Sequence, residues 1–508
     1  MRVELATSDL ERFRAAIASR LGLYFDEGKS GFLEEVLRRR IEATGRDAHA
    51  YLSGLEMKPA GEELGALGRE LTVAETYFFR NVEQYRALTD VVVPERLAAR
   101  AAERCLRVLS LGCASGEEAY SLAMLVRDTL ADVSWHVSVI GVDVNAVMIE
   151  KARRGRFSAW ALRETPEGDR QRWFRRDGRE FVLDDAIRAS VRFEQRNLAE
   201  EDPTFWKCGE YDVVFCRNVI MYFAPEQAQR LIGRIAHTLC PGGYLFLGHA
   251  ETLRGLSSDF HLCHTHGTFY YKRKAYAECA APMSRRYSEA IAGSVASLSD
   301  AAASSDSWVD AIRRASERVA ALTASRPVER AGDTSPAAVT PVWDRGLVLE
   351  LLRKERFADA LALVDALPSE SGRDADVLLL RSVLLVHGGQ LPDAEIACRR
   401  LLEVDELSAG AHYLLALCRE GAGDRAASLY HDQVAVYLDP GFAMPRLHVG
   451  LLARRAGERG TARRELGHAL VLLQREDTSR ILLFGGGFNR EALMALCRTE
   501  LLRCGGKA

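Results

Sequence analysis

The sequence predicts a doubly wound α/β domain, preceded by a small all-α domain and followed by an all-α array of repeats. From Cys105 onward, short apolar runs alternate with helical patterns, which is typical of a parallel sheet. Near the C-terminus, Gly389, Gly423 and Gly457 recur at an interval of 34 residues, which is typical of a helix-turn-helix repeat. A chain of 508 residues also has the length of about two or three folding units.

Composition excludes several classes of protein. Apolar residues make up 48% and charged residues 27%, which are globular values and not those of a disordered or fibrous chain. The net charge of −3 gives no overall attraction to nucleic acid or to an anionic membrane. No segment reads as a secretory signal or a membrane span, so we expect a cytoplasmic protein without direct membrane insertion.

Cysteine and histidine patterns do not indicate a metal site. The 11 cysteines contain no C-x-x-C pair and are expected to be reduced thiols. One Cys/His cluster, formed by His261, Cys263, His264 and His266, lacks the spacing of a zinc finger and has no second ligand pair nearby. We therefore expect ordinary strand or loop histidines there and no bound metal.

Residues 1–75 are expected to form the small helical domain. Apolar residues fall on one stripe at helical spacing: Phe32, Leu33, Val36, Leu37 and Ile41. Arg38 and Arg39 lie off this stripe, and solvated charge is the simplest interpretation of each. The run Arg38-Arg39-Arg40 nevertheless leaves open a binding face for an acidic partner.

Residues 76–275 are assigned to the α/β domain. Its expected strands are Arg107–Leu111, Val137–Val142, Val191–Gln195, Tyr211–Phe215 and Gly243–Leu247. An insertion at about 156–190 interrupts the pattern, because the run 173–182 alternates around an Asp177-Gly178 turn. Such a turn predicts a hairpin, and hence a small antiparallel sheet inserted in the domain.

The rest of the chain divides into three parts. Residues 276–342 are rich in Ala and Ser and are expected to be a linker with one helix near Val309–Leu322. Residues 343–480 contain the repeats, where Val383, Leu417 and Leu451 share the 34-residue interval of the glycines. An arbitrary helical bundle would not repeat in this way. Residues 481–508 are expected to be a C-terminal tail, with a close turn at its glycine run.

A glycine-rich turn and an acid point to a nucleoside cofactor. The turn Gly112–Gly116 joins a strand to a helix, and Asp143 ends the next strand, where it can accept hydrogen bonds from a ribose. The chain has no phosphate-binding G-x-G-x-x-G or G-x-x-x-x-G-K-[ST] at this place. S-adenosylmethionine fits best, since Glu117 and Glu118 would repel pyrophosphate but suit an ammonium or sulfonium. The alternatives are a packing turn, and acids that merely favour a helix N-terminus.

Two further strand ends carry polar residues where ligands of open α/β sheets bind. One is Arg196-Asn197-Leu198, and the other is Cys216-Arg217-Asn218. Capping of the next helix is an alternative for either asparagine taken singly. It is less credible for both, beside Asp143 and the glycine turn.

Four segments in order resemble the CheR family. They are Leu71-Thr-Val-Ala-Glu-Thr-Tyr-Phe-Phe-Arg80, Gly112-Cys-Ala-Ser-Gly-Glu-Glu118, Phe215-Cys-Arg-Asn-Val-Ile-Met-Tyr-Phe223 and Gly248-His-Ala-Glu-Thr252. Members of this family are S-adenosylmethionine-dependent methyltransferases with a Rossmann-like fold that esterify glutamates on chemotaxis receptors. The resemblance covers about residues 5–275, and the repeats look like the tetratricopeptide extension of some members.

The resemblance implies a set of site residues. The implied cofactor contacts are Thr76, Arg80, Gly112, Glu118, Asp143, Asn197, Leu198, Cys216, Arg217 and Asn218. Glu118 would bind the methionine part, Asp143 the ribose, and Asn197 with Leu198 the adenine. Arg80 and Tyr222 would be the catalytic residues, with Tyr222 as the hydrogen-bonding partner of Arg80. An ion pair for Arg80 and core packing for Tyr222 are the structural alternatives. Ala74 stands where the family usually has Asn.

The resemblance also implies partners. The product would be S-adenosylhomocysteine, and the substrate a methyl-accepting receptor's cytoplasmic domain, whose acidic helices the N-terminal arginines would face. The β insertion is the part that can hold a receptor tail by strand addition, and the repeats suggest a further protein partner. A competing interpretation is an interaction scaffold that binds the cofactor without turnover. A methyltransferase for nucleic acid or a small molecule is disfavoured, because Arg217-Asn218-Val219 replaces the Pro-Pro-aromatic signature of base methylators.

Overall fold

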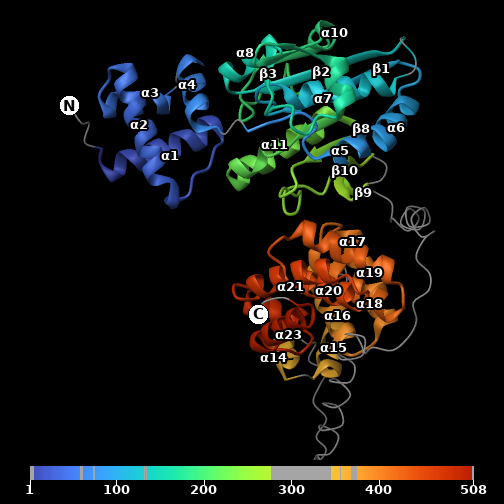
Figure 1. Cartoon of the computed structure of the whole chain (residues 1–508). Helices are drawn as coiled ribbons and strands as arrows, with labels where there is room; N and C mark the ends of the chain where they lie inside the picture. The colour runs from blue at the N-terminus through green and yellow to red at the C-terminus, as the bar shows by residue number, and fades with distance from the viewer. Residues whose placement is uncertain are drawn as a thin grey trace, which may run out of the picture. The chain divides into compact units, whose positions relative to one another are not determined.

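A computed structural model describes residues 5–505, except 58–60, 73–74, 131, 133, 276–344, 355 and 368–373. The predicted linker at 276–342 with its helix, and Ala74, lie outside the described residues. The chain forms two compact units, residues 1–280 and 281–508, and each is described by itself (Figure 1). Within the described ranges no helix has both the length and the apolar character needed to cross a membrane.

Four helices form the N-terminal domain: α1 (Thr7–Leu21), α2 (Ser30–Thr44), α3 (Ala48–Met57) and α4 (Gly61–Leu71). Leu33, Val36, Leu37 and Ile41 of α2 are buried as predicted. The prediction for Phe32 was wrong, because its side chain is 44% exposed. One residue is about 100° of rotation on a helix, so Phe32 falls at the border of the buried stripe.

The three consecutive arginines of α2 are paired within their own domain. Arg38 lies 2.7 Å from Glu34, Arg39 lies 2.8 Å from Glu70, and Arg40 lies 2.6 Å from Glu63. A carboxylate is therefore already present for each guanidinium. These ion pairs favour a structural role for the three arginines over a role in binding an acidic partner.

The α/β domain is built on a seven-stranded sheet in the order β6-β2-β1-β7-β8-β10-β9. Its strands are β1 (Cys105–Leu111), β2 (His136–Asp143), β6 (Val191–Gln195), β7 (Tyr211–Cys216), β8 (Leu239–Leu247), β9 (Phe260–Thr265) and β10 (Thr268–Arg273). The five predicted strands are present and parallel, whereas the antiparallel β9 and β10 were not predicted. His261, Cys263 and His264 lie on β9, and no group of three metal-ligating residues occurs in the described part.

Helices connect and cover the strands. They are α5 (Val82–Ala87), α6 (Val93–Ala99), α7 (Glu117–Thr129), α8 (Ala146–Arg154), α10 (Asp185–Ala189) and α11 (Pro225–Thr238), with a π-helical turn at Leu88–Val92 after α5. The chain leaves β1 toward β2 and later returns to β7 on the other side of β1. The carboxyl ends of β1 and β7 therefore border a topological switch point, where open α/β sheets bind ligands.

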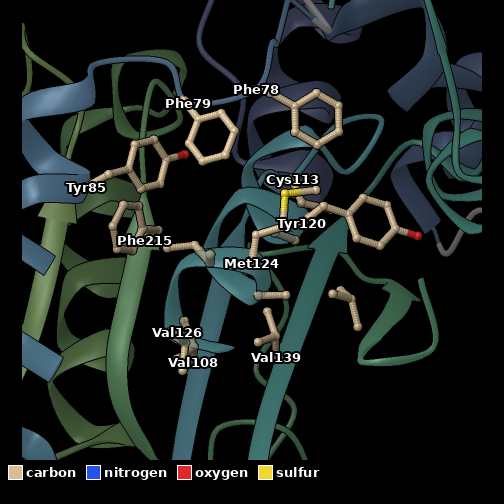
Figure 2. Packing of buried hydrophobic residues seen from close by; sticks show 14 of the residues in the cluster. Phe78, Phe79, Tyr85, Val108, Cys113, Tyr120, Met124, Val126, Val139 and Phe215 are labelled. Atoms are coloured by element: carbon tan, nitrogen blue, oxygen red, sulfur yellow. The ribbon is translucent and has the colours of Figure 1, made fainter. Parts of the chain in front are cut away.

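Aromatic packing fixes the segment before α5 against the sheet. Phe79 and Tyr85 meet edge to face at 5.9 Å, and Tyr85 stacks on Phe215 of β7 at 5.9 Å. Figure 2 shows these three rings grouped on one side of Met124, with Tyr120 of α7 on the other side. The segment that carries Thr76 and Arg80 is thus anchored by Phe79, which lies within it, and by Tyr85, which follows it.

The predicted hairpin insertion is confirmed. Strands β3 (Arg156–Ser158), β4 (Phe174–Asp177) and β5 (Glu180–Leu183) form a separate antiparallel sheet in the order β3-β5-β4, and α9 (Glu167–Trp173) precedes β4. Asp177 and Glu180 pair across the turn, where Gly178 has a φ of 62°. The left-handed backbone there explains the Asp-Gly signal in the sequence.

The second unit is an array of helical hairpins. Its helices are α14 (Arg345–Arg353), α15 (Phe357–Asp365), α16 (Ala375–His387), α17 (Leu391–Val404), α18 (Ala409–Gly421), α19 (Arg425–Leu438), α20 (Ala443–Arg455), α21 (Arg459–Leu473), α22 (Thr478–Phe484) and α23 (Arg490–Arg503). The starts of α16, α18 and α20 are 34 residues apart. Gly389, Gly423 and Gly457 occupy equivalent turns with φ between 72° and 80°, which explains the repeated glycine.

Residues 481–505 are not an appended tail. Helix α23 packs on α21 with Leu493 and Cys497 buried. The carbonyl of Leu483 lies 3.1 Å from His387 Nε2 of α16, and the Phe484 ring lies 5.0 Å from Phe442 before α20. Helix α22 therefore contacts α16 and the start of α20. Phe484 also contacts Tyr413 of α18, with the two ring centroids 6.1 Å apart.

Candidate active site

A cavity of about 300 Å³ opens at the carboxyl ends of β1, β2 and β7, a size within the range of small-molecule sites. Ten of the eleven sequence-predicted site residues line it: Thr76, Arg80, Gly112, Glu118, Asp143, Asn197, Leu198, Arg217, Asn218 and Tyr222. Segments that are more than 100 residues apart in the chain are thus brought to one place by the sheet topology.

Cys216 is the exception. It ends β7 with its side chain fully buried, and it does not line the cavity. Burial raises the pKa of its thiol well above the ordinary value. All six residues of β7 are buried, and it is the residues after the strand, beginning with Arg217, that reach the cavity.

The turn after β1 requires glycine at two positions. Gly112 has a φ of 71°, and a Cβ there would lie 2.5 Å from Val219 Cγ2. Gly116 has a φ of 92°, and a Cβ there would lie 2.8 Å from the Cβ of Ala152. The turn thus lies close to the Val219 loop at the wall of the cavity. The Gly-rich signal indicated a close approach at this turn but not the residue that it approaches.

Asp143 is held at the tip of β2 by backbone donors. Its Oδ2 accepts a hydrogen bond from Ala114 N at 2.9 Å, and its Oδ1 accepts one from Asn145 N at 2.8 Å. Burial raises the pKa of Asp143, and the backbone hydrogen bonds oppose this shift. A carboxylate can accept about four hydrogen bonds, so capacity remains for two hydroxyls of a ribose.

Glu118 forms a buried pair with Arg217. Ser110 Oγ donates to Glu118 Oε1 at 2.8 Å, and Arg217 Nη1 lies 3.5 Å from Glu118 Oε2. Burial raises the pKa of Glu118, although Arg217 acts against this shift. Arg217 is itself fixed, because its Nη2 donates to Arg80 O at 2.6 Å and to Asn81 Oδ1 at 2.9 Å.

Glu117, the neighbouring acid, does not line the cavity. It is buried under the turn, where Ser115 Oγ donates to its carboxylate at 2.9 Å. Burial raises the pKa of Glu117 to about 7. Only one of the two acids at the start of α7 therefore belongs to the site.

Arg80 reaches the cavity without a carboxylate partner among the described residues. Its Nη1 donates to the carbonyl of Glu75 at 3.2 Å, and its guanidinium lies 5.7 Å from the Tyr77 ring centroid. Arg80 therefore does not form, with any described residue, the ion pair that was the structural alternative to a catalytic role. The expected hydrogen bond to Tyr222 is not found either, although both residues line the cavity.

The N-terminal domain closes one side of the cavity through Leu21 and Leu23, which the sequence did not indicate. Leu23 forms an isolated antiparallel bridge with Phe223, and Tyr24 N donates to the carbonyl of Tyr222 at 2.7 Å. Asn197 Nδ2 donates to Arg20 O at 2.7 Å. The amide of Asn197 is therefore used to fasten the two domains, which gives its side chain a structural role at the border of the cavity.

Glu251 organises the loop after β7. Its Oε2 accepts hydrogen bonds from Asn218 N at 2.7 Å and Gly248 N at 2.8 Å. Its Oε1 accepts them from Val219 N at 2.8 Å and Met221 N at 3.2 Å. Glu251 lies in the segment Gly248–Thr252 that carries the family resemblance, but no role was predicted for it. A buried carboxylate shared by four backbone donors explains why this position carries an acid.

These residues fit a nucleoside cofactor with an amino-acid end. The buried Glu118 carboxylate matches an ammonium, and Asp143 matches ribose hydroxyls. Arg217 lines the cavity with its guanidinium beside Glu118, so it can serve the cofactor's carboxylate. Gly112 and Val219 both line the cavity, and the absence of a side chain at Gly112 lets the turn lie against Val219.

Comparison with known proteins agrees with this geometry. Residues 74–269 match the family model described as CheR methyltransferase, SAM binding domain. "Chemotaxis protein methyltransferase 2" of Vibrio cholerae is 34% identical over 275 residues, which cover 53% of this chain and 94% of that protein. "Probable biofilm formation methyltransferase WspC" of Pseudomonas putida is 29% identical over 457 residues, covering 89% of this chain and 96% of that one.

The relatives thus match the catalytic unit alone or, with WspC, most of the chain. Because a relative above 30% identity is matched over nearly its whole length, the cofactor is S-adenosylmethionine, with S-adenosylhomocysteine as its product. This chain belongs to the CheR family of S-adenosylmethionine-dependent methyltransferases.

Proposed function

We propose that this protein transfers the methyl group of S-adenosylmethionine to glutamate carboxylates of methyl-accepting receptors, forming glutamyl methyl esters. The observation that carries the proposal is Arg80, a cation without a carboxylate partner among the described residues, which lines the cofactor cavity together with Tyr222. Such a cation is suited to an anionic substrate side chain. Names of relatives that refer to chemotaxis support a receptor as the substrate.

The reaction asks the protein for positioning rather than for acid–base chemistry. A glutamate has a pKa of about 4.3 and is already the anionic nucleophile at neutral pH. The bound cofactor supplies an electrophilic methyl group. We assign to Arg80 the task of orienting the carboxylate and offsetting its charge, and to Tyr222 a place beside the transferred methyl. The carboxylate oxygen forms a bond to carbon while the sulfur–carbon bond breaks, and no proton has to move.

The proposal extends to the other cofactor contacts. Asp143 would hold the ribose, Glu118 and Arg217 the amino-acid end, and Leu198 the adenine. Thr76 and Asn218 line the same cavity and would complete the pocket near the methyl group. The side chain of Asn197 is already engaged by Arg20, so we assign it to the wall rather than to the adenine.

The remaining parts would serve recognition. Strands β3 and β4 are the edges of the small sheet, and an edge strand can take up a receptor tail by strand addition. The helical array would bind a further protein, as arrays of this kind do. The protein would act in the cytoplasm, where the receptor domains that it modifies are found. Two relatives that align over the array are named for biofilm formation, so receptors of surface-associated signalling are the first to test.

The first experiment is calorimetric titration of S-adenosylhomocysteine into the full-length protein and into Asp143→Ala. We expect saturable binding that the substitution abolishes. The second experiment is transfer of a radiolabelled methyl group to receptor cytoplasmic domains, with release of the label by mild base, as an ester requires. Binding without transfer to any receptor domain would favour the alternative of a cofactor-binding scaffold. Label that resists base would exclude the ester.

A further inference from the structure

A stack of three side chains stands beside the cavity, and the proposed reaction does not use it. The guanidinium carbon of Arg163 lies 3.6 Å from the Tyr77 ring centroid and 4.2 Å from the Trp160 ring centroid. Tyr77 lines the cavity, and Trp160 is 68% exposed. We call these residues, Tyr77, Arg163 and Trp160, the aromatic–arginine stack. It leads from the cavity to the surface.

The stack is held in place by backbone contacts. Arg163 Nη1 donates to the carbonyl of Trp160 at 2.9 Å, which closes the turn that carries both residues. Phe78 N, next to Tyr77, donates to the carbonyl of Ala161 at 2.9 Å, which ties that turn to the Arg80 segment. A guanidinium between two rings loses little further side-chain entropy on binding a ligand. The stack is thus preorganised at a fixed place relative to Arg80.

The charge of the stack is only loosely compensated. Among the described residues, the carboxylate within ion-pair reach of Arg163 is that of Glu75, at 3.9 Å, with a side chain that is 69% exposed. Arg80 lies 5.7 Å from the same Tyr77 ring, so two guanidinium groups flank one tyrosine. An exposed ion pair of this length contributes little, at most about 1 kcal/mol. A ligand carboxylate with better geometry can therefore replace Glu75.

We propose that the aromatic–arginine stack docks the acidic segment that surrounds the reactive glutamate, and that Arg163 pairs with a second carboxylate of this segment. The proposal rests on the proposed function, because Arg80 would take the reactive carboxylate. The stack adjoins the cavity through Tyr77, and the positive charge of Arg163 is complementary to a carboxylate. Both features point to an acidic segment next to the reactive glutamate as the occupant. Trp160 covers the apolar stem of the bound side chain, in the way that exposed Trp and Arg residues anchor interfaces. Arg163 thus contacts the substrate directly and sets substrate preference.

The test measures methyl-transfer kinetics of full-length Arg163→Gln on a receptor cytoplasmic domain. We expect KM for the domain to rise about tenfold, the usual effect of losing an interface anchor, with kcat and the Kd of S-adenosylhomocysteine unchanged. Trp160→Ala should act in the same direction. Arg163→Lys keeps the charge but not the planar stack, and should recover only part of the loss.

The matched control is Arg172→Gln. Arg172 belongs to the same insertion, stacks on Trp173 at 4.1 Å and pairs with Asp128 at 2.9 Å, whereas Arg163 stacks on Tyr77, which lines the cavity. Its substitution should leave KM within about twofold of the wild-type value, as surface changes usually do. An equal rise of KM in both variants would indicate general damage to the insertion and would overturn the proposal.

A pair of synthetic peptides identifies the carboxylate. Both carry one reactive glutamate, and one carries a second glutamate where the other has glutamine. Wild-type protein should prefer the diacidic peptide, and Arg163→Gln should lose this preference. Equal use of both peptides by wild type would overturn the inference alone. No methylation of any receptor domain or peptide by wild type would instead overturn the proposed function.

Discussion

Replacing Glu251 by glutamine should loosen the loop that forms one wall of the cofactor cavity. The carboxylate accepts four backbone hydrogen bonds, two on each oxygen. Glutamine keeps one oxygen and places an NH₂ group against two backbone donors. Each hydrogen bond to a charged acceptor is worth about 1.5–3 kcal/mol. The loss of two should therefore lower the free energy of unfolding by about 3–6 kcal/mol.

The assay is urea unfolding of the full-length protein followed by tryptophan fluorescence. Four of the six tryptophans, Trp135, Trp160, Trp173 and Trp206, lie in the catalytic unit, so the signal reports mainly on that unit. Calorimetry with S-adenosylhomocysteine should show at least about tenfold weaker binding, because Val219 would no longer be held beside the glycine turn. The control is Glu226→Gln at an exposed position of α11. If Glu251→Gln lowered the free energy of unfolding by less than about 1 kcal/mol and left S-adenosylhomocysteine binding unchanged, the role given to Glu251 in holding the loop would be refuted.

Three further predictions concern charge and packing. Burial raises the pKa of Glu118, and only its ionised form can pair with an ammonium, so affinity for S-adenosylhomocysteine should fall as pH falls through this raised pKa. Calorimetry across a pH series checks this, and Glu118→Gln should flatten the profile. In the array, burial lowers the pKa of His448, but Asp432 at 2.7 Å and Glu420 at 3.0 Å outweigh it and bring the pKa to about 10. The stabilisation by charged His448 is full below pH 6.5 and is lost as pH rises toward 10. The melting temperature, followed by circular dichroism, should therefore fall over this pH window in the wild type and fall less in His448→Gln. Phe484→Ala should destabilise the array by about 3–5 kcal/mol in urea unfolding followed by circular dichroism, and an unchanged midpoint would contradict the packing described for α22.

Local sequence signals predicted the parallel strands and the hairpin because each depends on neighbouring residues. The Asp177-Gly178 turn needs one left-handed residue, and glycine supplies it at the position that the structure uses. The antiparallel β9 and β10 were missed because the histidines of β9 and the consecutive aromatic residues of β10 give a weak alternating pattern. Phe32 was misplaced because a helical stripe defines its centre better than its edges.

The candidate site was predictable where a residue type is tied to a strand end. Asp143 and Asn218 were found in this way, since sheet topology brings strand ends together. Leu23 and Glu251 were not, because their roles depend on contacts with the Phe223 region and the Val219 loop that are remote in sequence. Cys216 was predicted because it adjoins Arg217 and Asn218, but it ends a strand whose residues are all buried and so does not reach the cavity.

Helix α22 constrains how this array can change during evolution. Arrays in which each repeat meets only its neighbours can gain or lose a unit without harm elsewhere. Here residues Leu483 and Phe484 contact three successive repeats at once, through His387, Tyr413 and Phe442. Deletion or duplication of one 34-residue unit would change which side chains stand opposite α22. The number of repeats before α22 is therefore coupled to the sequence of α22, and the two can change only together.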